Sequence, residues 1–139
     1  PTLRDQPDIP GAKGHLAEEM VTNVIAELLI GVRRDPVYGA TLTIGIGGVT
    51  AELLADTVTL VLPVTAKDVA QALQTLRLWP LLDGFRGRPK ADAADVIDVA
   101  LALQNMLETG TALEEVEINP LMVRAQGAVA VDAVIWKET

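Results

Sequence analysis

A proline- and glycine-containing turn between two apolar stretches is the feature that most constrains the fold. Residues 35–39 read Asp-Pro-Val-Tyr-Gly, a turn composition because proline fixes φ and glycine accepts positive φ. Residues 24–32 before the turn are apolar except for a lone Glu27, and residues 40–44 after it alternate with β-branched side chains. The sequence therefore predicts extended structure over residues 24–32 and an antiparallel hairpin with residues 40–44.

Three further stretches have the pattern of strands. Residues 57–62 alternate polar and apolar side chains and stop at Pro63, which predicts a third strand. Residues 115–123 and 128–135 flank the short connection at residues 124–127. This arrangement predicts a second antiparallel hairpin near the end of the chain.

Two segments have helical periodicity. Thr65 and Asp68 have the spacing of a capping box, and the apolar residues that follow predict a helix over residues 66–78 that ends at Trp79-Pro80. Residues 81–89 are expected to form a loop. A second helix, ending near Gly110, is predicted from a one-sided apolar pattern made by Val96, Val99, Ala100, Leu103, Met106 and Leu107.

These elements predict an α+β fold in which an antiparallel sheet of two hairpins plus one strand is covered on one face by two helices. With 139 residues, half of them apolar, the chain is long enough for one core. We expect residues 1–14 to be an irregular N-terminal segment, because they are polar and rich in proline, and residues 15–139 to form one domain. The opening at Pro1 leads us to expect a part of a longer polypeptide.

Composition excludes several classes of function. A net charge of −8 repels phosphate backbones, so nucleic acid is not an expected partner. The chain has no cysteine, which excludes disulfides and thiolate metal sites within it. No apolar run is long enough to span a bilayer and the N-terminus lacks a signal-peptide pattern, so we expect a cytoplasmic protein without membrane contact. ATP remains a possible ligand, because magnesium offsets phosphate charge.

Oxygen-bearing side chains gather in the predicted C-terminal hairpin. Glu117 and Asn119 are two residues apart, so they project from the same face of a strand. Asp132 on the return strand lies near them if the register of the hairpin permits. Such a set suits magnesium. The alternative is the solvated face of an edge strand with a bulge or strand end at Asn119-Pro120, and spacing alone favours that alternative.

Four segments, in order, resemble one family. Residues 117–121, Glu-Ile-Asn-Pro-Leu, followed by a glycine-containing turn and Val131-Asp132, resemble the metal-binding hairpin of the ATP-grasp domain in ADP-forming acyl-CoA synthetases, including the succinyl-CoA synthetase β subunit. Residues 18–21 and 27–39 resemble the adenine hinge and the hairpin after it. Residues 45–49 with Glu52 and Asp56, and residues 82–87, resemble further landmarks. The resemblance extends over about residues 15–135 and implies the C-terminal subdomain of that domain.

The resemblance also implies ligands. Magnesium would be held by Asn119 and Asp132 with Glu117 nearby, and ATP or ADP would lie against a hinge whose backbone edge at residues 19–21 belongs to a strand. Glycines after the second strand would let backbone amides approach a phosphate or a phosphohistidine segment. Taken alone, these glycines predict a tight turn and the acidic residues predict surface charge. The implied nucleotide contacts are Glu19, Met20, Val21, Thr22, Glu27, Gly47 and Gly48.

A complete family enzyme contains parts that this sequence does not supply. The family interconverts acid, CoA and ATP with acyl-CoA, ADP and phosphate through acyl-phosphate and phosphohistidine intermediates. Its reactive histidine has no counterpart in the context of His15, so the resemblance assigns no catalytic residue here. Arg86 and Arg88 could contact phosphate or CoA, although solvated loop charge is the favoured interpretation.

The resemblance implies that the remaining ATP-grasp subdomain, with its phosphate-contacting lysine, and the CoA-binding and ligase domains of the parent protein are partners. We therefore expect no turnover from the isolated chain. Two alternatives remain at this stage. One is a regulatory ligand-binding module of a protein lysine acetyltransferase, and the other is an α+β interaction domain with a fortuitous Glu-Ile-Asn-Pro string.

Overall fold

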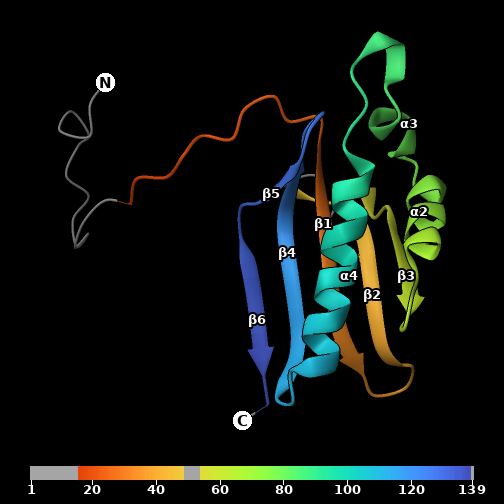
Figure 1. The fold of residues 1–139 in the computed structure, drawn as a ribbon, viewed down its shortest axis with the longest axis vertical. Helices are drawn as coiled ribbons and strands as arrows, with labels where there is room; N and C mark the ends of the chain where they lie inside the picture. Colours follow the sequence, from red (N-terminus) through yellow and green to blue (C-terminus); the bar gives the residue numbers. More distant parts are fainter. Residues whose placement is uncertain (1–15, 49–53, 139) are drawn as a thin grey trace.

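The computed structural model describes residues 16–48 and 54–138 and contains a six-stranded antiparallel sheet (Figure 1). The strand order is β3-β2-β1-β4-β5, and β6 pairs with β4 beyond the end of β5. The strands are β1 (Ala26–Asp35), β2 (Gly39–Ile46), β3 (Thr57–Val61), β4 (Leu113–Val123), β5 (Ala128–Ala130) and β6 (Ala133–Lys137). The expected α+β class with two hairpins and a further strand is confirmed.

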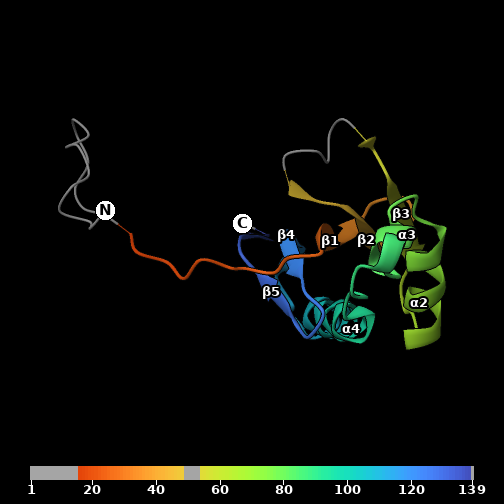
Figure 2. The same ribbon diagram turned by 90° about the horizontal axis from the view of Figure 1, so that it is seen from above.

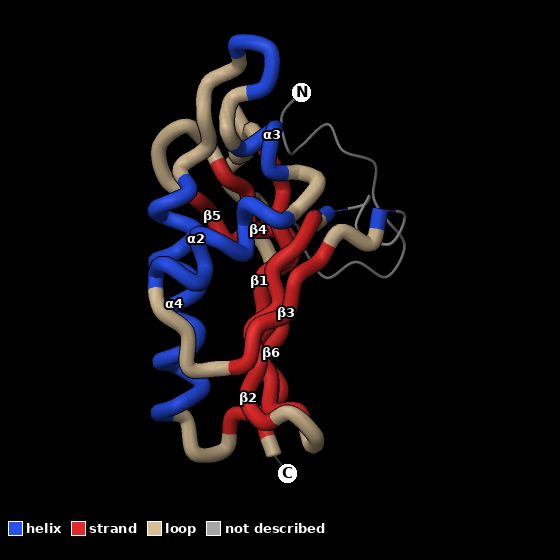
Figure 3. The backbone as a smooth tube through the Cα atoms, turned by 90° about the vertical axis from the view of Figure 1, so that its right-hand side faces the viewer, coloured by secondary structure: helices blue, strands red, loops and turns tan. Residues whose placement is uncertain are grey.

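The helices lie on one side of this sheet (Figures 2 and 3). They are α2 (Ala66–Thr75), the short α3 (Trp79–Leu82), the 3-10 turn η3 (Phe85–Gly87) and α4 (Ala93–Thr109). The predicted capping box is present, because Thr65 Oγ1 accepts the Asp68 N–H at 3.3 Å and Asp68 Oδ2 accepts the Thr65 N–H at 2.8 Å. These bonds satisfy amide groups that the first turn of a helix leaves without partners.

The helix predicted over residues 66–78 is too long. Helix α2 ends at Thr75 because Leu76 is extended, and the carboxylate of Asp56 accepts the N–H groups of Arg77 and Leu78, each at 3.0 Å. Pro80 does not end a helix but lies in the first turn of α3, where its missing N–H leaves no hydrogen bond unmade. The loop expected over residues 81–89 is therefore wrong in its first part, which belongs to α3.

The predicted first hairpin is confirmed. Asp35 pairs with Gly39 across the turn, and Gly39 has a φ of +80°. Asp35 Oδ1 accepts the N–H groups of Val37 at 2.9 Å and Tyr38 at 3.0 Å. The bonds from Tyr38 and Val37 hold the pKa of the Asp35 carboxyl below its usual range.

The second hairpin differs from the prediction, because its return arm is divided into β5 and β6 at residues 131–132. The division lies beside an irregularity in β4: Leu28 pairs with Leu121 and Ile30 with Ile118, so two residues of β4 lie opposite one residue of β1. This is the arrangement of a β-bulge at residues 119–120. The bulge is bonded to the interruption, with Asn119 N donating to Asp132 O at 3.1 Å.

The sheet has one covered face and one open face. On the covered face, Leu28, Ile30 and Val32 of β1 are buried beneath the helices. Their neighbours Leu29 and Gly31 point the other way, because side chains alternate along a strand. The open face carries most of the candidate functional residues, so the fold positions them on a rigid sheet whose other side is a continuous apolar core.

Some expectations fall on residues outside the described part of the chain. These are the irregular segment over residues 1–14, His15, and the landmark residues Val49 and Glu52. Within the described part, no helix is long and apolar enough to cross a membrane.

Candidate functional site

Two glycines directly after β2 lie against β1. Gly47 N–H donates to the carbonyl of Glu27 at 2.8 Å, and a Cβ added to Gly47 would lie 2.5 Å from the carbonyl oxygen of Leu28. Gly48 has a φ of +68°, and a Cβ there would overlap the Glu27 carboxylate. Gly47 therefore has no room for a side chain, because its backbone packs directly on β1, and the positive φ of Gly48 favours glycine at the second position. We call this segment the glycine loop (residues 47–48).

The glycine loop also reaches β4. Gly48 N–H donates to the side-chain oxygen Oδ1 of Asn119 at 3.0 Å, across 71 positions in the sequence. One end of the loop is thus bonded to the backbone of Glu27 and the other to the side chain of Asn119. The structure brings the predicted nucleotide residues Glu27, Gly47 and Gly48 together with one predicted metal ligand.

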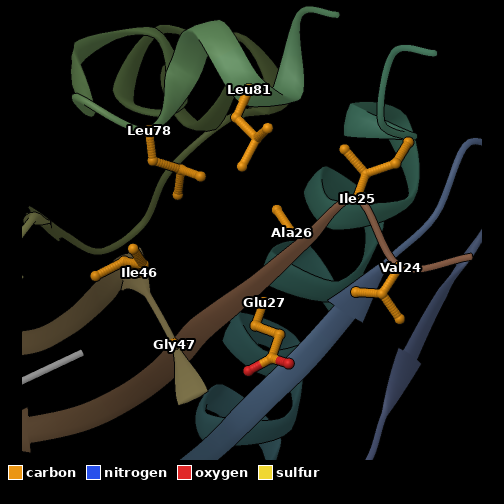
Figure 4. Close-up of a pocket in the computed structure, with 8 residues that line it drawn as sticks. All are labelled: Val24, Ile25, Ala26, Glu27, Ile46, Gly47, Leu78 and Leu81. Atoms are coloured by element: carbon orange, nitrogen blue, oxygen red, sulfur yellow. The ribbon is translucent and has the colours of Figure 1, made fainter. Parts of the chain in front are cut away.

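A cavity of about 390 Å³ lies between the start of β1, the end of β2 and α3 (Figure 4). Leu78 and Leu81 extend into it from the helical side, and Ile46 lies across from them. Among the residues that the structure describes, Glu27 supplies the only carboxylate of the lining, which consists of Val24, Ile25, Ala26, Glu27, Ile46, Gly47, Leu78 and Leu81. An apolar cavity with one acceptor at its rim suits an apolar ligand group that carries hydroxyl donors.

Glu117, Asn119 and Asp132 line one small cavity of about 90 Å³ together with Ala133 and Val134. The bulge in β4 and the interruption before β6 place Asn119 beside Asp132, and Glu117 pairs with Val134 in β6. Asp132 Oδ1 accepts the N–H of Ala133 at 2.8 Å, which orients the carboxylate. The three oxygen donors singled out from the sequence therefore lie around the same space.

The chemistry of this donor set fits magnesium. Two carboxylates and one amide are hard oxygen ligands, and magnesium commonly takes one or two carboxylates while keeping waters and substrate phosphates. Within the described residues, no group of three His, Cys, Asp or Glu side chains is placed to hold a metal. With two carboxylates and one amide oxygen, the set around the small cavity would leave coordination positions open for water and phosphate.

A second cavity on the open face, of about 240 Å³, shares the lining residue Glu117 with the small one. Its lining includes Leu29, Gly31 and Arg33 of β1, Thr43 of β2 and further residues of β3 and β4. A side chain at Gly31 would lie 3.1 Å from the carbonyl oxygen of Val116. The glycine therefore permits close pairing of β1 with β4 and leaves the centre of the open face uncrowded.

Residues 16–25 form no strand, so the hinge strand predicted at residues 19–21 is wrong as secondary structure. The segment instead passes the end of β4 and β5, where residues 19–22 line a cavity of about 250 Å³ with Arg124 and Val129. The structure thus separates Glu19, Met20, Val21 and Thr22 from the cavity that contains Glu27. An extended segment outside the sheet keeps its backbone donors and acceptors available to a ligand.

Arg124 also lines this cavity, and no pattern in the sequence had singled it out. Among the described residues, its Nε is buried and has no hydrogen-bond partner. A buried guanidinium nitrogen without a partner is unfavourable unless a ligand pairs with it. By contrast, Arg86 lies in an exposed loop with its guanidinium 5.1 Å from the centre of the Phe85 ring, outside the cavities described above.

Comparison with known proteins identifies the class of domain to which this fold belongs. A family model described as ATP-grasp domain matches residues 4–136. The chain therefore belongs to the ATP-grasp family. It is 33% identical over 110 residues to the β subunit of acetate–CoA ligase (ADP-forming) II of Pyrococcus furiosus, covering 77% of this chain and 47% of that protein.

Longer relatives have the same type of activity in their names. The chain is 33% identical over 125 residues to acetate–CoA ligase (ADP-forming) II of Archaeoglobus fulgidus, covering 90% of this chain and 18% of that protein. A solved structure of acetyl-coenzyme A synthetase 1 from Ca. Korarchaeum cryptofilum, in complex with coenzyme A and Mg-AMPPCP, has a TM-score of 0.77 at 31% identity. The match covers 81% of this chain and 53% of that one. The chain thus spans about half of the β subunit and less than a fifth of the longer ligase.

Proposed function

We propose that this chain is the C-terminal subdomain of the ATP-grasp domain in an ADP-forming acyl-CoA synthetase and that it binds magnesium with ATP or ADP. The observation that carries the proposal is the meeting of Glu117, Asn119 and Asp132 around one small cavity, bonded through Asn119 to the glycine loop. This arrangement suits phosphate groups that carry a metal ion, because the side-chain oxygens would bind the ion while neighbouring backbone N–H groups donate to phosphate oxygens.

In this proposal the carboxylates of Glu117 and Asp132 and the amide oxygen of Asn119 hold magnesium. When bound, the ion would offset the negative charge of the phosphate groups. The chain's own residues orient the nucleotide: Glu27 accepts hydrogen bonds from ribose hydroxyls, and the backbone of residues 19–22 contacts the base. The unpaired Nε of Arg124 in the cavity beside residues 19–22 supports a ligand there.

The whole protein would interconvert acyl-CoA, ADP and phosphate with acid, CoA and ATP through acyl-phosphate and phosphohistidine intermediates. Relatives roughly two to six times as long as the matched segment support further domains, including the other ATP-grasp subdomain and CoA-binding domains. The open face also has apolar side chains on β6 that another domain could cover, since Val134 is 46% exposed and Trp136 is 61% exposed. Without the other ATP-grasp subdomain, we propose that the isolated chain has no turnover.

A ligase is favoured over a regulatory module of a protein lysine acetyltransferase. The relatives described above are named as CoA ligases, and the match to the ATP-grasp domain extends over residues 4–136, a range that includes Glu117, Asn119 and Asp132. Nothing in the structure gives specific support to the acetyltransferase alternative.

Titration of magnesium–ADP into the isotope-labelled 139-residue chain, followed by NMR, tests the binding proposal even where binding is weak. We expect shifts at residues around Glu117, Asn119 and Asp132, with both Asn119→Ala and Asp132→Ala reducing affinity at least about tenfold, since each ligand contributes about 1.4 kcal/mol or more. Exposed residues of α4 supply matched controls, Asn105→Ala and Asp98→Ala. Equal affinity in folded site variants and controls would remove the metal assignment.

Phosphate-dependent ATP formation from acyl-CoA tests the wider proposal. It requires the complete polypeptide that carries this chain, compared with the same Asn119→Ala and Asp132→Ala variants. Loss of ATP formation in folded variants is expected, because the magnesium-bound phosphate would no longer be positioned. Full activity in both variants would contradict the proposed role of this subdomain.

A further inference from the structure

Asn119 differs from the other two oxygen donors of the small cavity in what it contacts. Glu117 and Asp132 belong to β4 and to the segment before β6, and they line the cavity. Asn119 lines it too, but its Oδ1 also accepts the Gly48 N–H at 3.0 Å. One amide oxygen therefore belongs to both the cavity and the glycine loop.

The backbone holds Asn119 in this position. Its N–H donates to the carbonyl of Asp132 at 3.1 Å, and Val131 N–H donates to the carbonyl of Pro120, also at 3.1 Å. Both residues of the bulge are thus bonded to the segment between β5 and β6. These bonds hold the backbone of Asn119 in place independently of the loop that its side chain contacts.

The two residues of the glycine loop are held by different parts of the molecule, Gly47 by the backbone of β1 and Gly48 by the side chain of Asn119. Gly47 is bonded to the backbone of Glu27 at 2.8 Å and packed on β1 so closely that a Cβ has no room. Gly48, one residue further on, has its N–H directed to the Asn119 side chain. A change at Asn119 Oδ1 would therefore act on Gly48 while Gly47 stays in place.

We propose that Asn119 is a positioning residue that couples a cation in the small cavity to the glycine loop. This inference rests on the proposed function, because the cation is the magnesium of that site. A cation at Oδ1 withdraws electron density from the amide oxygen and places positive charge near the Gly48 N–H, so that hydrogen bond weakens. The Gly48 N–H then becomes a donor for a phosphate oxygen of the nucleotide that accompanies the cation.

The coupling gives the site an order of events. Without a cation, the Gly48 donor is occupied by Asn119, so the loop has less to offer a free phosphate. With a cation bound, both the cation and the Gly48 N–H are available to bind a phosphate oxygen. The loop would thus favour the metal-bound form of the nucleotide over the metal-free form.

The Gly48 amide in the full 139-residue chain reports on the coupling by proton–nitrogen NMR and hydrogen exchange. In wild type, magnesium chloride alone is expected to move the Gly48 proton resonance upfield and to speed its exchange up to about tenfold, the factor that corresponds to a hydrogen bond of about 1.4 kcal/mol. The shift should follow the same saturation curve as residues beside Asp132. This measurement requires no substitution.

Three variants separate a positioning role from a merely structural one. Asn119→Ala should speed Gly48 exchange without magnesium and abolish the response to magnesium. Asn119→Asp retains an acceptor and a ligand, so it should restore both slow exchange and the response. Asp132→Ala should keep exchange slow without magnesium but remove the response, and Asn105→Ala on α4 should behave as wild type.

The outcomes distinguish this inference from the function on which it rests. If magnesium shifts residues beside Asp132 and Glu117 while Gly48 stays unchanged, the coupling is wrong and the metal site stands. If magnesium shifts neither group, the proposed metal site and the coupling both fail. Unchanged Gly48 exchange in folded Asn119→Ala without magnesium would also overturn the coupling.

Discussion

The two faces of the sheet are built from the same strands but follow different rules. On the covered face, Leu28, Ile30 and Leu42 have no measurable exposure and pack in a continuous apolar core. On the open face, the strands carry carboxylates and glycines, such as Glu117 and Gly31, in and around shallow cavities. The difference indicates that stability is concentrated on one side, which leaves the other free to hold a ligand.

The sharpest test of this comparison uses two neighbouring leucines in β1. Leu28 lies on the covered face and is fully buried, whereas Leu29 lies on the open face and is partly exposed. We expect Leu28→Ala to lower the free energy of unfolding by about 2–5 kcal/mol, because it removes buried methyl groups and leaves a cavity. Leu29→Ala should cost roughly 1 kcal/mol, since less apolar surface returns to water.

Urea denaturation of both variants, monitored by circular dichroism, measures the difference. Equal losses of stability in the two variants would contradict the division between faces. It would mean that the open face contributes to the core as much as the covered face does.

The second test concerns the glycine loop, which follows β2 and packs on the backbone of β1. Gly47→Ala would place a Cβ 2.5 Å from the Leu28 carbonyl oxygen and 2.7 Å from the Leu29 amide nitrogen. The backbone must shift, so we expect a loss of about 1–3 kcal/mol together with weaker magnesium–ADP binding by NMR titration.

Gly39→Ala is the matched control for this substitution. Gly39 has a positive φ of +80°, but an added Cβ there meets nothing within 4 Å. It should cost roughly 1–2 kcal/mol from backbone strain alone and leave binding unchanged. If Gly39→Ala weakens binding as much as Gly47→Ala does, the effect at Gly47 is not local to the site.

The sequence predicted the covered face better than the open face. Strand alternation and helical spacing identify apolar positions such as Val96 and Ala100 directly, because one repeating pattern determines which side is buried. It did not predict the divided return strand, because β5 and β6 are separated where β4 bulges against β1. That irregularity depends on pairing between segments far apart in the chain.

The candidate site shows the same division. The spacing of Glu117 and Asn119 predicted two donors on one face, and the structure brings Asp132 to them. The bond from Gly48 to Asn119 joins residues 71 positions apart, and no local pattern indicates it. Arg124 was missed for a related reason, since its importance depends on a buried nitrogen without a partner among the described residues.

Arg124 offers a third test, in which stability and binding are expected to separate. Arg124→Met keeps much of the apolar stem but removes the buried, unpaired Nε. We therefore expect a change in unfolding free energy within about 1 kcal/mol, and no large loss. Affinity for magnesium–ADP should fall several-fold to about tenfold if the guanidinium pairs with the ligand, since that corresponds to about 1 kcal/mol.

Calorimetric unfolding and NMR titration of the same Arg124→Met sample separate these two effects. A large loss of stability with unchanged affinity would reverse the interpretation and make Arg124 a structural residue. Arg88→Met, in the exposed loop before α4, is a control for loss of positive charge and should affect neither quantity appreciably.

The smallest expected effect concerns Asp92, which joins the start of α4 to the turn between β4 and β5. Its Oδ2 accepts the Gly127 N–H of the β4–β5 turn at 2.9 Å, and its Oδ1 accepts the Asp95 N–H of the helix at 3.2 Å. The bonds from Gly127 and Asp95 hold the pKa of the Asp92 carboxyl below its usual range. Because the folded pKa is lowered, the stabilisation is present above the usual aspartate pKa and is lost as pH falls through the folded value.

Asp92→Asn should therefore be modestly less stable than wild type at neutral pH, because an amide has one acceptor where the carboxylate has two. The difference should shrink as the pH falls below about 4, near the usual aspartate value, because the stabilisation is lost progressively as the pH approaches the lower pKa of the folded carboxyl. Thermal unfolding at a series of pH values measures this, with the exposed Asp98→Asn as control. A difference that is constant from neutral to acidic pH would show that the charge of Asp92 does not stabilise this junction, and the helix would then be joined to the turn by neutral contacts alone.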